Sequence, residues 1–163
     1  ALSPHMRVGL AQSCLTHRMD DEASEVMLGA LNGGDDALSP QQALNVFVRA
    51  GRPDLADGIG VQLRAQAQIL LGVADEKRHM GDVRGAVQTL LEALHVAPND
   101  RQGVIAVVGG VLRQIMEMGW DHPLAALSEE QLDHIRALDP DHPRLAALDA
   151  ELAAAKRRYG IST

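Results

Sequence analysis

Hydrophobic residues recur three or four positions apart along most of the chain, which is the spacing of amphipathic α-helices. Residues 82–96 show this most clearly, because Leu90, Leu91 and Leu94 form one apolar stripe. The pattern predicts nine helices, with boundaries placed to within a few residues. They cover residues 4–18, 20–32, 39–50, 53–66, 68–80, 82–96, 101–118, 124–138 and 143–159.

Residues that break or open helices mark most of these boundaries. Ser39 and Pro40 open the third helix, a loop is expected at 32–36, and Pro98 ends the sixth helix. Residues 66–68 contain no such breaker. The fourth and fifth helices are therefore either continuous or sharply bent.

Short motifs predict further local features of the second half. Ser128 and Gln131 have the spacing of a capping box, which would start a new helix inside the eighth. Asp-His-Pro occurs at 121–123 and 141–143, where Asp would cap a helix and Pro would occupy its first turn. Two glycines at 109–110 lie in an apolar helical run. We expect close helix packing there, with a backbone contact to a ligand as the alternative.

The chain also contains an internal repeat. "GRPDLA" starts at Gly51, "GDVRGA" starts at Gly81, and a weaker copy, "RMDDEA", starts at Arg18. The alanines that end these three copies, Ala23, Ala56 and Ala86, lie 33 and 30 residues apart. That period is typical of two-helix solenoid units. The glycines are expected to take a left-handed conformation in the turn, and the alanines to lie where two helices cross closely.

Composition supports a helical core and a single domain. Apolar residues make up 46% of the 163 residues, but only Phe47, Trp120 and Tyr159 are aromatic. A core of Leu, Ala, Val, Ile and Met suits packed helices better than packed sheets. We therefore expect one all-α domain over 1–163, a right-handed solenoid of antiparallel helix pairs. Because the chain starts with Ala, we expect it to be a fragment of a longer protein.

The net charge of the chain argues against two classes of partner. The net charge is −7 and the isoelectric point about 5.4, which argues against nucleic acid and against an anionic membrane surface. No apolar run approaches the roughly 20 residues that span a bilayer, and no signal peptide is visible. These features predict a cytoplasmic protein.

The sequence offers little for catalysis. No two of its seven histidines have the i,i+3 or i,i+4 spacing of helical metal ligands. A nucleophile elbow and a phosphate-binding glycine loop are also absent. Cys14, the one cysteine, lies in a helical apolar pattern and is expected to be a small core residue, with a reactive thiol as the alternative. We expect a non-enzymatic protein without metal or cofactor.

Three features of the last third of the chain are expected to have structural roles. Trp120 is expected to anchor the seventh helix to the eighth, with a partner hot spot as the alternative. Residues 156–158 are basic, which suits a helix C-terminus. Leu145, Leu148 and Leu152 form a stripe by which the last helix would cap the stack.

The repeat pattern resembles the tetratricopeptide repeat family. Residues 67–100 match best, and the matching positions are Gly81, Asp82, Ala86, Leu90, Ala93 and Pro98. The other units would span 4–37, 37–70 and 101–140, followed by a capping helix at 143–159. Leu70 and Lys77 stand where the family has aromatic residues, and Gly60 where it has a large apolar one.

The order of segments in the second half is similar to a more particular group. "GDVRGAVQTLLEALHVAPND", a long helix ending in "MEMGW", "IRALDPDHPRLAALDAEL" and a terminal "RRYG" resemble the carboxy-terminal domain of bacterial response regulators whose receiver domain precedes tetratricopeptide repeats. This resemblance implies an output domain of two-component signalling that binds another protein. The receiver and its phosphorylated Asp would lie outside this chain.

The family resemblance also implies a concave binding surface formed by the first helix of each unit. Polar residues projected onto it are Gln12, Asn45, Arg49, Asp75, Arg78 and Arg113. Such a surface suits an extended or helical peptide, with Asn45 bonding its backbone and an arginine receiving a carboxylate. The alternatives are a solvated inner face, or one filled by the last helix. A different function, self-association into a homo-oligomer, also stays open.

Overall fold

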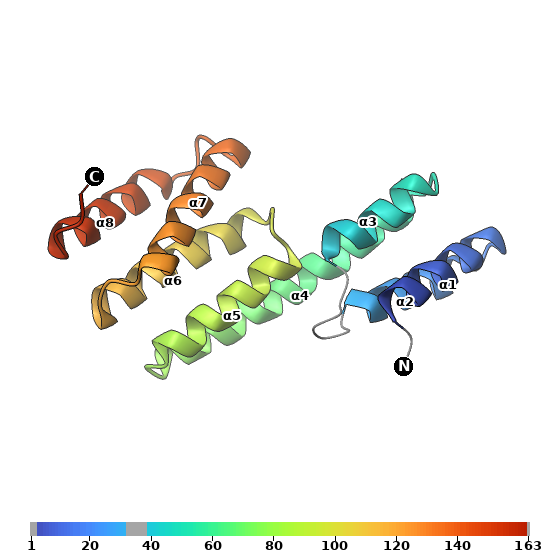
Figure 1. The fold of residues 1–163 in the computed structure, drawn as a ribbon, viewed down its shortest axis with the longest axis horizontal. Helices are drawn as coiled ribbons and strands as arrows, with labels where there is room; N and C mark the ends of the chain where they lie inside the picture. Colours follow the sequence, from blue (N-terminus) through green and yellow to red (C-terminus); the bar gives the residue numbers. More distant parts are fainter. Residues whose placement is uncertain (1–2, 32–38, 163) are drawn as a thin grey trace. The chain divides into compact units, whose positions relative to one another are not determined.

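The structure, a computed structural model, describes residues 3–31 and 39–162. Within these residues it contains eight α-helices and no strand, which confirms the all-α class (Figure 1). The predicted loop at 32–36 lies outside the described residues. The helices are α1 (Pro4–Thr16), α2 (Asp20–Leu31), α3 (Pro40–Arg49), α4 (Pro53–His79), α5 (Val83–Val96), α6 (Arg101–Met118), α7 (His122–Leu138) and α8 (Leu145–Arg158).

The chain divides into two compact units, residues 1–65 and residues 66–163. The first unit contains α1, α2, α3 and the first half of α4. The second contains the rest of α4 together with α5, α6, α7 and α8. A single domain over 1–163 stays a prediction.

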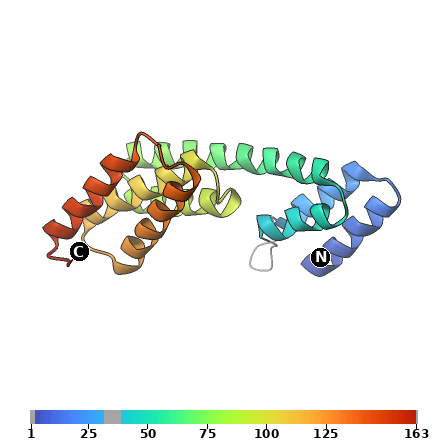
Figure 2. The same cartoon turned by 90° about the horizontal axis from the view of Figure 1, so that it is seen from above.

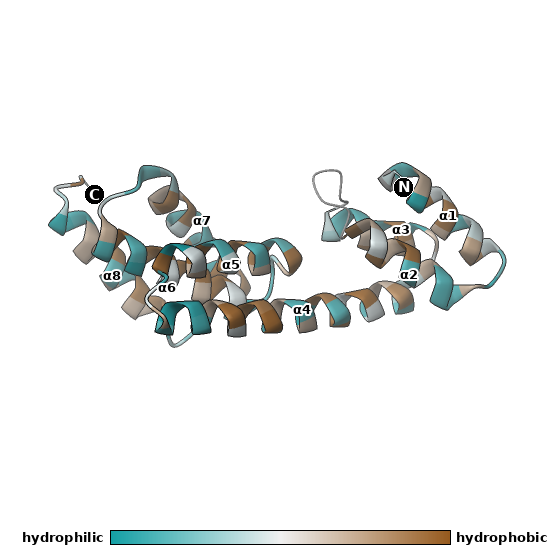
Figure 3. Cartoon of the chain, turned by 90° about the horizontal axis from the view of Figure 1, so that it is seen from below, coloured by the Kyte–Doolittle hydropathy of each residue, from teal (hydrophilic) through white to brown (hydrophobic). Residues whose placement is uncertain are grey.

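The prediction of nine helices was wrong by one, and the difference lies in α4. The segments 53–66 and 68–80 form one helix of 27 residues, which Figures 2 and 3 show as a single helical ribbon with hydrophobic segments recurring along it. Residues 64–71, "RAQAQILL", are mostly strong helix formers and include no Gly or Pro. Of the two alternatives left open by the sequence, the continuous helix is therefore the correct one.

The turns that precede the repeated alanines share one backbone geometry. Gly51 and Gly81 have φ of 72° and 83°, and Arg18 takes the same left-handed region with φ of 58°. In each turn the next residue donates its N–H to the carbonyl five residues earlier, over 2.8–2.9 Å. This is the bond that closes a Schellman-type helix end. The alanines that follow the three turns, Ala23, Ala56 and Ala86, are all buried.

Two of the predicted helix starts are confirmed. Ser39 caps α3, where its hydroxyl accepts from the N–H of Gln42 and the Gln42 amide oxygen accepts from the N–H of Ser39. Asp121 caps α7 and accepts from the N–H of Leu124 over 3.1 Å. Pro occupies the first turn of both helices.

Two other predicted helix starts were wrong. Helix α7 continues through Ser128, whose buried hydroxyl donates to the carbonyl of Ala125 over 2.7 Å instead of capping a new helix. The amide oxygen of Gln131 is buried and lacks a hydrogen-bond partner among the described residues. At 141–143 the chain forms a turn, and α8 begins later, at Leu145, without a side-chain cap.

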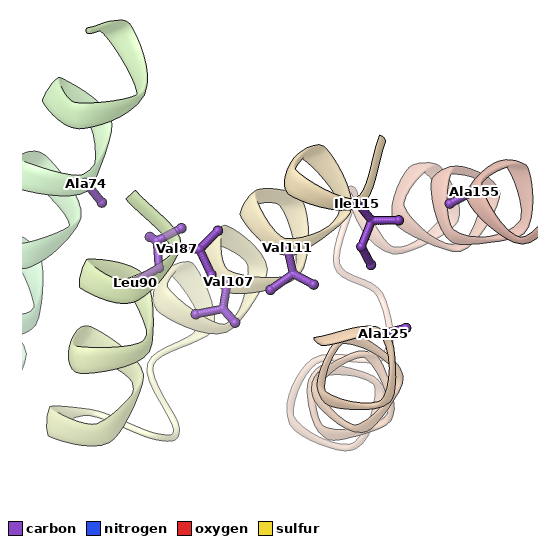
Figure 4. Packing of buried hydrophobic residues seen from close by; sticks show 8 residues of the cluster. All are labelled: Ala74, Val87, Leu90, Val107, Val111, Ile115, Ala125 and Ala155. Carbon is purple, nitrogen blue, oxygen red and sulfur yellow. The ribbon is translucent and has the colours of Figure 1, made fainter. Parts of the chain in front are cut away.

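Helix α6 is the centre of the second unit's core. On one side its Val107, Val111 and Ile115 belong to a cluster with residues of α4, α5, α7 and α8 (Figure 4). On the other side Val104, Val108 and Leu112 pack with α7 and α8. The α8 members of this second cluster are Leu145, Leu148 and Leu152, the stripe expected from the sequence. Because α6 is apolar on both sides, it holds the other four helical segments of this unit together.

Trp120 anchors the end of α6, as expected, with an additional partner. It packs against the cluster that contains Ile115 and Ala125. Its ring also lies 6.3 Å from that of Tyr159, centroid to centroid. The Tyr159 hydroxyl donates to the carbonyl of Ile115 over 2.9 Å. The chain segment after α8 is thereby tied to the end of α6.

Arg52 joins two helix starts in the first unit. Its guanidinium donates two hydrogen bonds to Asp20 at the start of α2, both over 2.8 Å. It donates two more to Asp54 in the first turn of α4, over 3.0 and 2.8 Å. Hydrogen bonds from Arg52 lower the pKa of both carboxyl groups, and those bonds raise the pKa of Arg52. The arginine thus crosslinks α2 to the turn between α3 and α4.

The Arg52 cluster should make stability depend on pH. The pKa values of the two carboxyl groups are lower in the folded chain than in the unfolded chain. The contribution of the cluster to the free energy of unfolding is therefore fully present above the unfolded Asp pKa of about 3.9 and is lost as pH falls through the folded pKa values. We expect Arg52→Gln to lower the urea midpoint at neutral pH, measured by circular dichroism, and the difference from wild type to shrink in acid. Arg84→Gln, at an exposed arginine without a partner among the described residues, is the control. A difference that stays constant between neutral pH and acid would contradict this role.

Candidate peptide-binding groove

The second unit contains a groove of about 950 Å³. Its walls come from the second half of α4 and from α5, α6 and α8. Apolar side chains form much of its lining, and examples are Leu71, Val87, Leu90, Ile105 and Met116. A cavity of this size with an apolar lining and a few polar groups is typical of a ligand site.

A partly buried polar contact connects the α4 wall to α5. Lys77 donates through Nζ to the hydroxyl of Thr89 over 2.8 Å. The Thr89 hydroxyl in turn donates to the carbonyl of Gly85 over 3.0 Å. Ala74 of α4 is buried in the same cluster as Val87 of α5. Polar and apolar contacts therefore position the same pair of helices.

A second polar contact joins the α4 and α6 walls directly. The Gln68 side-chain amide donates to the Gln102 side-chain oxygen over 3.0 Å. Both residues line the groove. Gln68 lies on α4 and Gln102 is the second residue of α6, so the bond connects the two walls at this position.

The two adjacent glycines of α6 have different environments. A Cβ on Gly110 would lie 2.5 Å from Cδ1 of Leu90, so the expected close helix packing is confirmed there. A Cβ on Gly109 would meet nothing within 4 Å, and the same holds for Gly72 on α4. Both of these glycines line the groove. At Gly109 the expected close packing is therefore absent and the backbone faces open space; a backbone contact to a ligand there stays a prediction.

Charged side chains line the groove on three helices. Arg78 and Asp75 form an ion pair on α4. Arg113 of α6 and Arg144, at the start of α8, have no ion-pair partner among the described residues. The acidic residues Glu117 and Glu151 also line the groove. The lining therefore offers separate positive and negative groups beside an apolar surface.

The structure brings together half of the residues projected from the sequence. Asp75, Arg78 and Arg113 all line the groove. Gln12 lies on α1, and Asn45 and Arg49 lie on α3, all exposed in the first unit. The Asn45 side-chain oxygen accepts from the Gln41 side-chain amide over 3.0 Å. Whether any of these residues binds a partner stays a prediction.

Sequence reasoning missed the contribution of α8. Arg144, Glu151 and Ala154 line the groove, while the leucine stripe of the same helix packs into the core. The last helix therefore borders the groove and leaves it open, instead of filling it. The periodicity of the leucines identified the buried face of α8, but the projection considered only the first helix of each unit.

The described residues contain no group of three or more His, Cys, Asp or Glu that could hold a metal ion. Cys14 is buried, as expected of a small core residue. No helix in the described ranges is long and apolar enough to cross a membrane.

No protein-family model, curated protein or solved structure matches the chain. The resemblance to tetratricopeptide repeats therefore rests on the residues alone.

The two glycines of α6 should respond differently to alanine. Gly109→Ala replaces a poor helix former in open space and should raise the free energy of unfolding by up to about 1 kcal/mol. Gly110→Ala has the same propensity gain but must displace Leu90, so it should be the less stable variant. Urea unfolding followed by fluorescence of Trp120, the only tryptophan, reports on this unit. Equal stabilities in the two variants would contradict the packing described here.

Proposed function

We propose that this chain is a non-enzymatic protein-interaction domain that binds a segment of another protein in the groove of its second unit. The observation that carries the proposal is the composition of the groove. An apolar lining of about 950 Å³ is combined with the charged groups of Asp75, Arg78 and Arg113. The repeat pattern projects the same three residues onto a binding surface.

The chemistry of the lining favours a particular kind of segment. Arg113 and Arg144 are available to a carboxylate, because neither has an ion-pair partner among the described residues. Gly72 and Gly109 allow a backbone to approach the two walls closely. The partner is therefore an extended or helical peptide with apolar side chains and at least one acidic group.

The family resemblance makes the proposal more specific. In this interpretation the helical pairs are units of a right-handed solenoid similar to tetratricopeptide repeats. The chain is the output domain of a bacterial two-component response regulator and acts in the cytoplasm. The three matching turns at Arg18, Gly51 and Gly81 support the repeat units. The continuous α4 departs from them, because the pattern expects a turn between 66 and 68.

Peptides selected against the chain from a random display library provide the test. We expect Arg113→Ala to weaken the selected peptides by about tenfold or more, since a hydrogen bond to a charged group contributes about 1.5–3 kcal/mol. Arg78→Ala should also weaken binding, by less, because Arg78 is already paired with Asp75. Isothermal titration calorimetry measures both affinities.

Arg84→Ala is the matched control, because Arg84 is an exposed arginine of α5 that does not line the groove. Circular dichroism verifies that all three variants are folded. If the selected peptides bind Arg113→Ala and Arg78→Ala as tightly as wild type, the groove is not the binding site and the proposal fails.

A further inference from the structure

One row of residues on α6 runs along the groove with a fixed order of chemical groups. Its members are four positions apart, all line the groove, and are Ile105, Gly109, Arg113 and Glu117. Residues at this spacing form a continuous ridge on the surface of a helix. Along the row stand an apolar side chain, a position without a side chain, a cation and an anion. Because the row lies on a single helix, the distances along it follow from helix geometry alone.

The two charged groups of the row are open to a partner. Arg113 and Glu117 are exposed, and neither side chain forms an ion pair or a hydrogen bond within the described residues, even with the other. An acidic residue that precedes a basic one by four positions stabilises a helix better than one that follows it, and here the acid follows. A carboxylate on Arg113 and a cation on Glu117 would satisfy both groups.

The size of the groove favours an extended peptide over a helical one. The lining of α6 runs from Gln102 to Glu117, which is about 22 Å of helix at a rise of about 1.5 Å per residue. A bound helix of that length and about 10 Å in diameter would occupy about 1,700 Å³, well above the volume of about 950 Å³ that the groove offers. An extended peptide covers the same length with only about seven residues, at about 3.3 Å each.

An extended peptide matches the row of α6 two residues at a time. Alternate side chains of an extended chain point to the same side and are about 6.6 Å apart. Neighbours in the α6 row are about 6 Å apart along the helix axis. Side chains that bind Arg113 and Glu117 are therefore two peptide residues apart, and a side chain that packs on Ile105 is four residues from the first. At Gly109, where an added Cβ would meet nothing within 4 Å, the peptide backbone has room to approach α6.

We propose that the groove selects extended segments in which an acidic residue has an apolar residue four positions to one side and a basic residue two positions to the other. The acidic residue binds Arg113, the basic residue binds Glu117 and the apolar residue packs on Ile105. The spacing is the same for either direction of the peptide. The proposal rests on the proposed function, since a peptide must occupy the groove, and adds to it the conformation of the peptide and the basic residue.

The sequences of peptides selected from a random display library against the whole chain test the spacing. After alignment they should share an acidic and a basic residue two positions apart, with an apolar residue four positions from the acidic one on the other side. A helical partner would instead place the acidic and basic residues four positions apart, because it rises about 1.5 Å per residue. Enrichment of that spacing, or of no basic residue at all, would overturn the proposal.

An exchange of charges tests the contact with Glu117 in one selected peptide. Replacing the basic residue of the peptide by glutamate should weaken its binding to wild type about fivefold or more, because repulsion replaces attraction. Glu117→Lys should restore the binding of the altered peptide and weaken that of the original. Glu92→Lys, at an exposed glutamate of α5 that does not line the groove, is the matched control and should do neither. Isothermal titration calorimetry measures all four affinities, and circular dichroism verifies that both variants are folded.

The Arg113→Ala variant separates failure of this proposal from failure of the proposed function. If Arg113→Ala weakens the selected peptides while Glu117→Lys changes the affinity of neither peptide, the groove binds peptides without the basic contact. That result overturns the present proposal alone. If Arg113→Ala also leaves the affinities unchanged, the peptides bind elsewhere and both proposals fail.

Discussion

Helix α4 runs without a break from Pro53 to His79, and the groove depends on this. Its second half supplies one wall of the groove, and Gln68, at the position where the repeat pattern expects a turn, lies in that wall. A turn at 66–68 would end one helix there and start another, so Gln68 would no longer continue the wall. Since Arg64 to Leu71 contains neither Gly nor Pro, no residue favours such a turn and the helix continues.

The groove depends equally on the packing of α6. Its two apolar sides bind α4 and α5 through one cluster and α7 and α8 through both, so the walls are set by the core behind them. Gly110 brings α6 close to Leu90, while Gly109 on the next position leaves the groove open. The walls of the groove stand on helices that are held by buried apolar contacts and by a partly buried polar one. Binding to such a surface loses less conformational entropy than binding to a loop that must first become ordered.

Local sequence rules predicted much of the fold and part of the candidate site. The turns at Gly51 and Gly81 were predictable because few residues other than glycine take a left-handed conformation without strain. The capping box at Ser128 was wrong because a buried position let its hydroxyl bond the preceding turn, and tertiary packing overrode the local signal. The cluster of Arg52 with Asp20 and Asp54 was missed because Asp20 is 32 residues from Arg52, and local spacing rules do not relate residues that far apart. The repeat alignment places Asp20 and Arg52 near equivalent turns. It was the one feature of the sequence that indicated a contact between them.

Amide hydrogen exchange at residues 66–71 tests the continuity of α4 most directly. In an uninterrupted helix each of these N–H groups donates to the carbonyl four residues earlier, so they should exchange as slowly as the N–H groups on either side of them. A turn at 66–68 would leave the first N–H groups of a new helix without such an acceptor. Exchange that is fast at 68–71 and slow on both sides would therefore contradict the account.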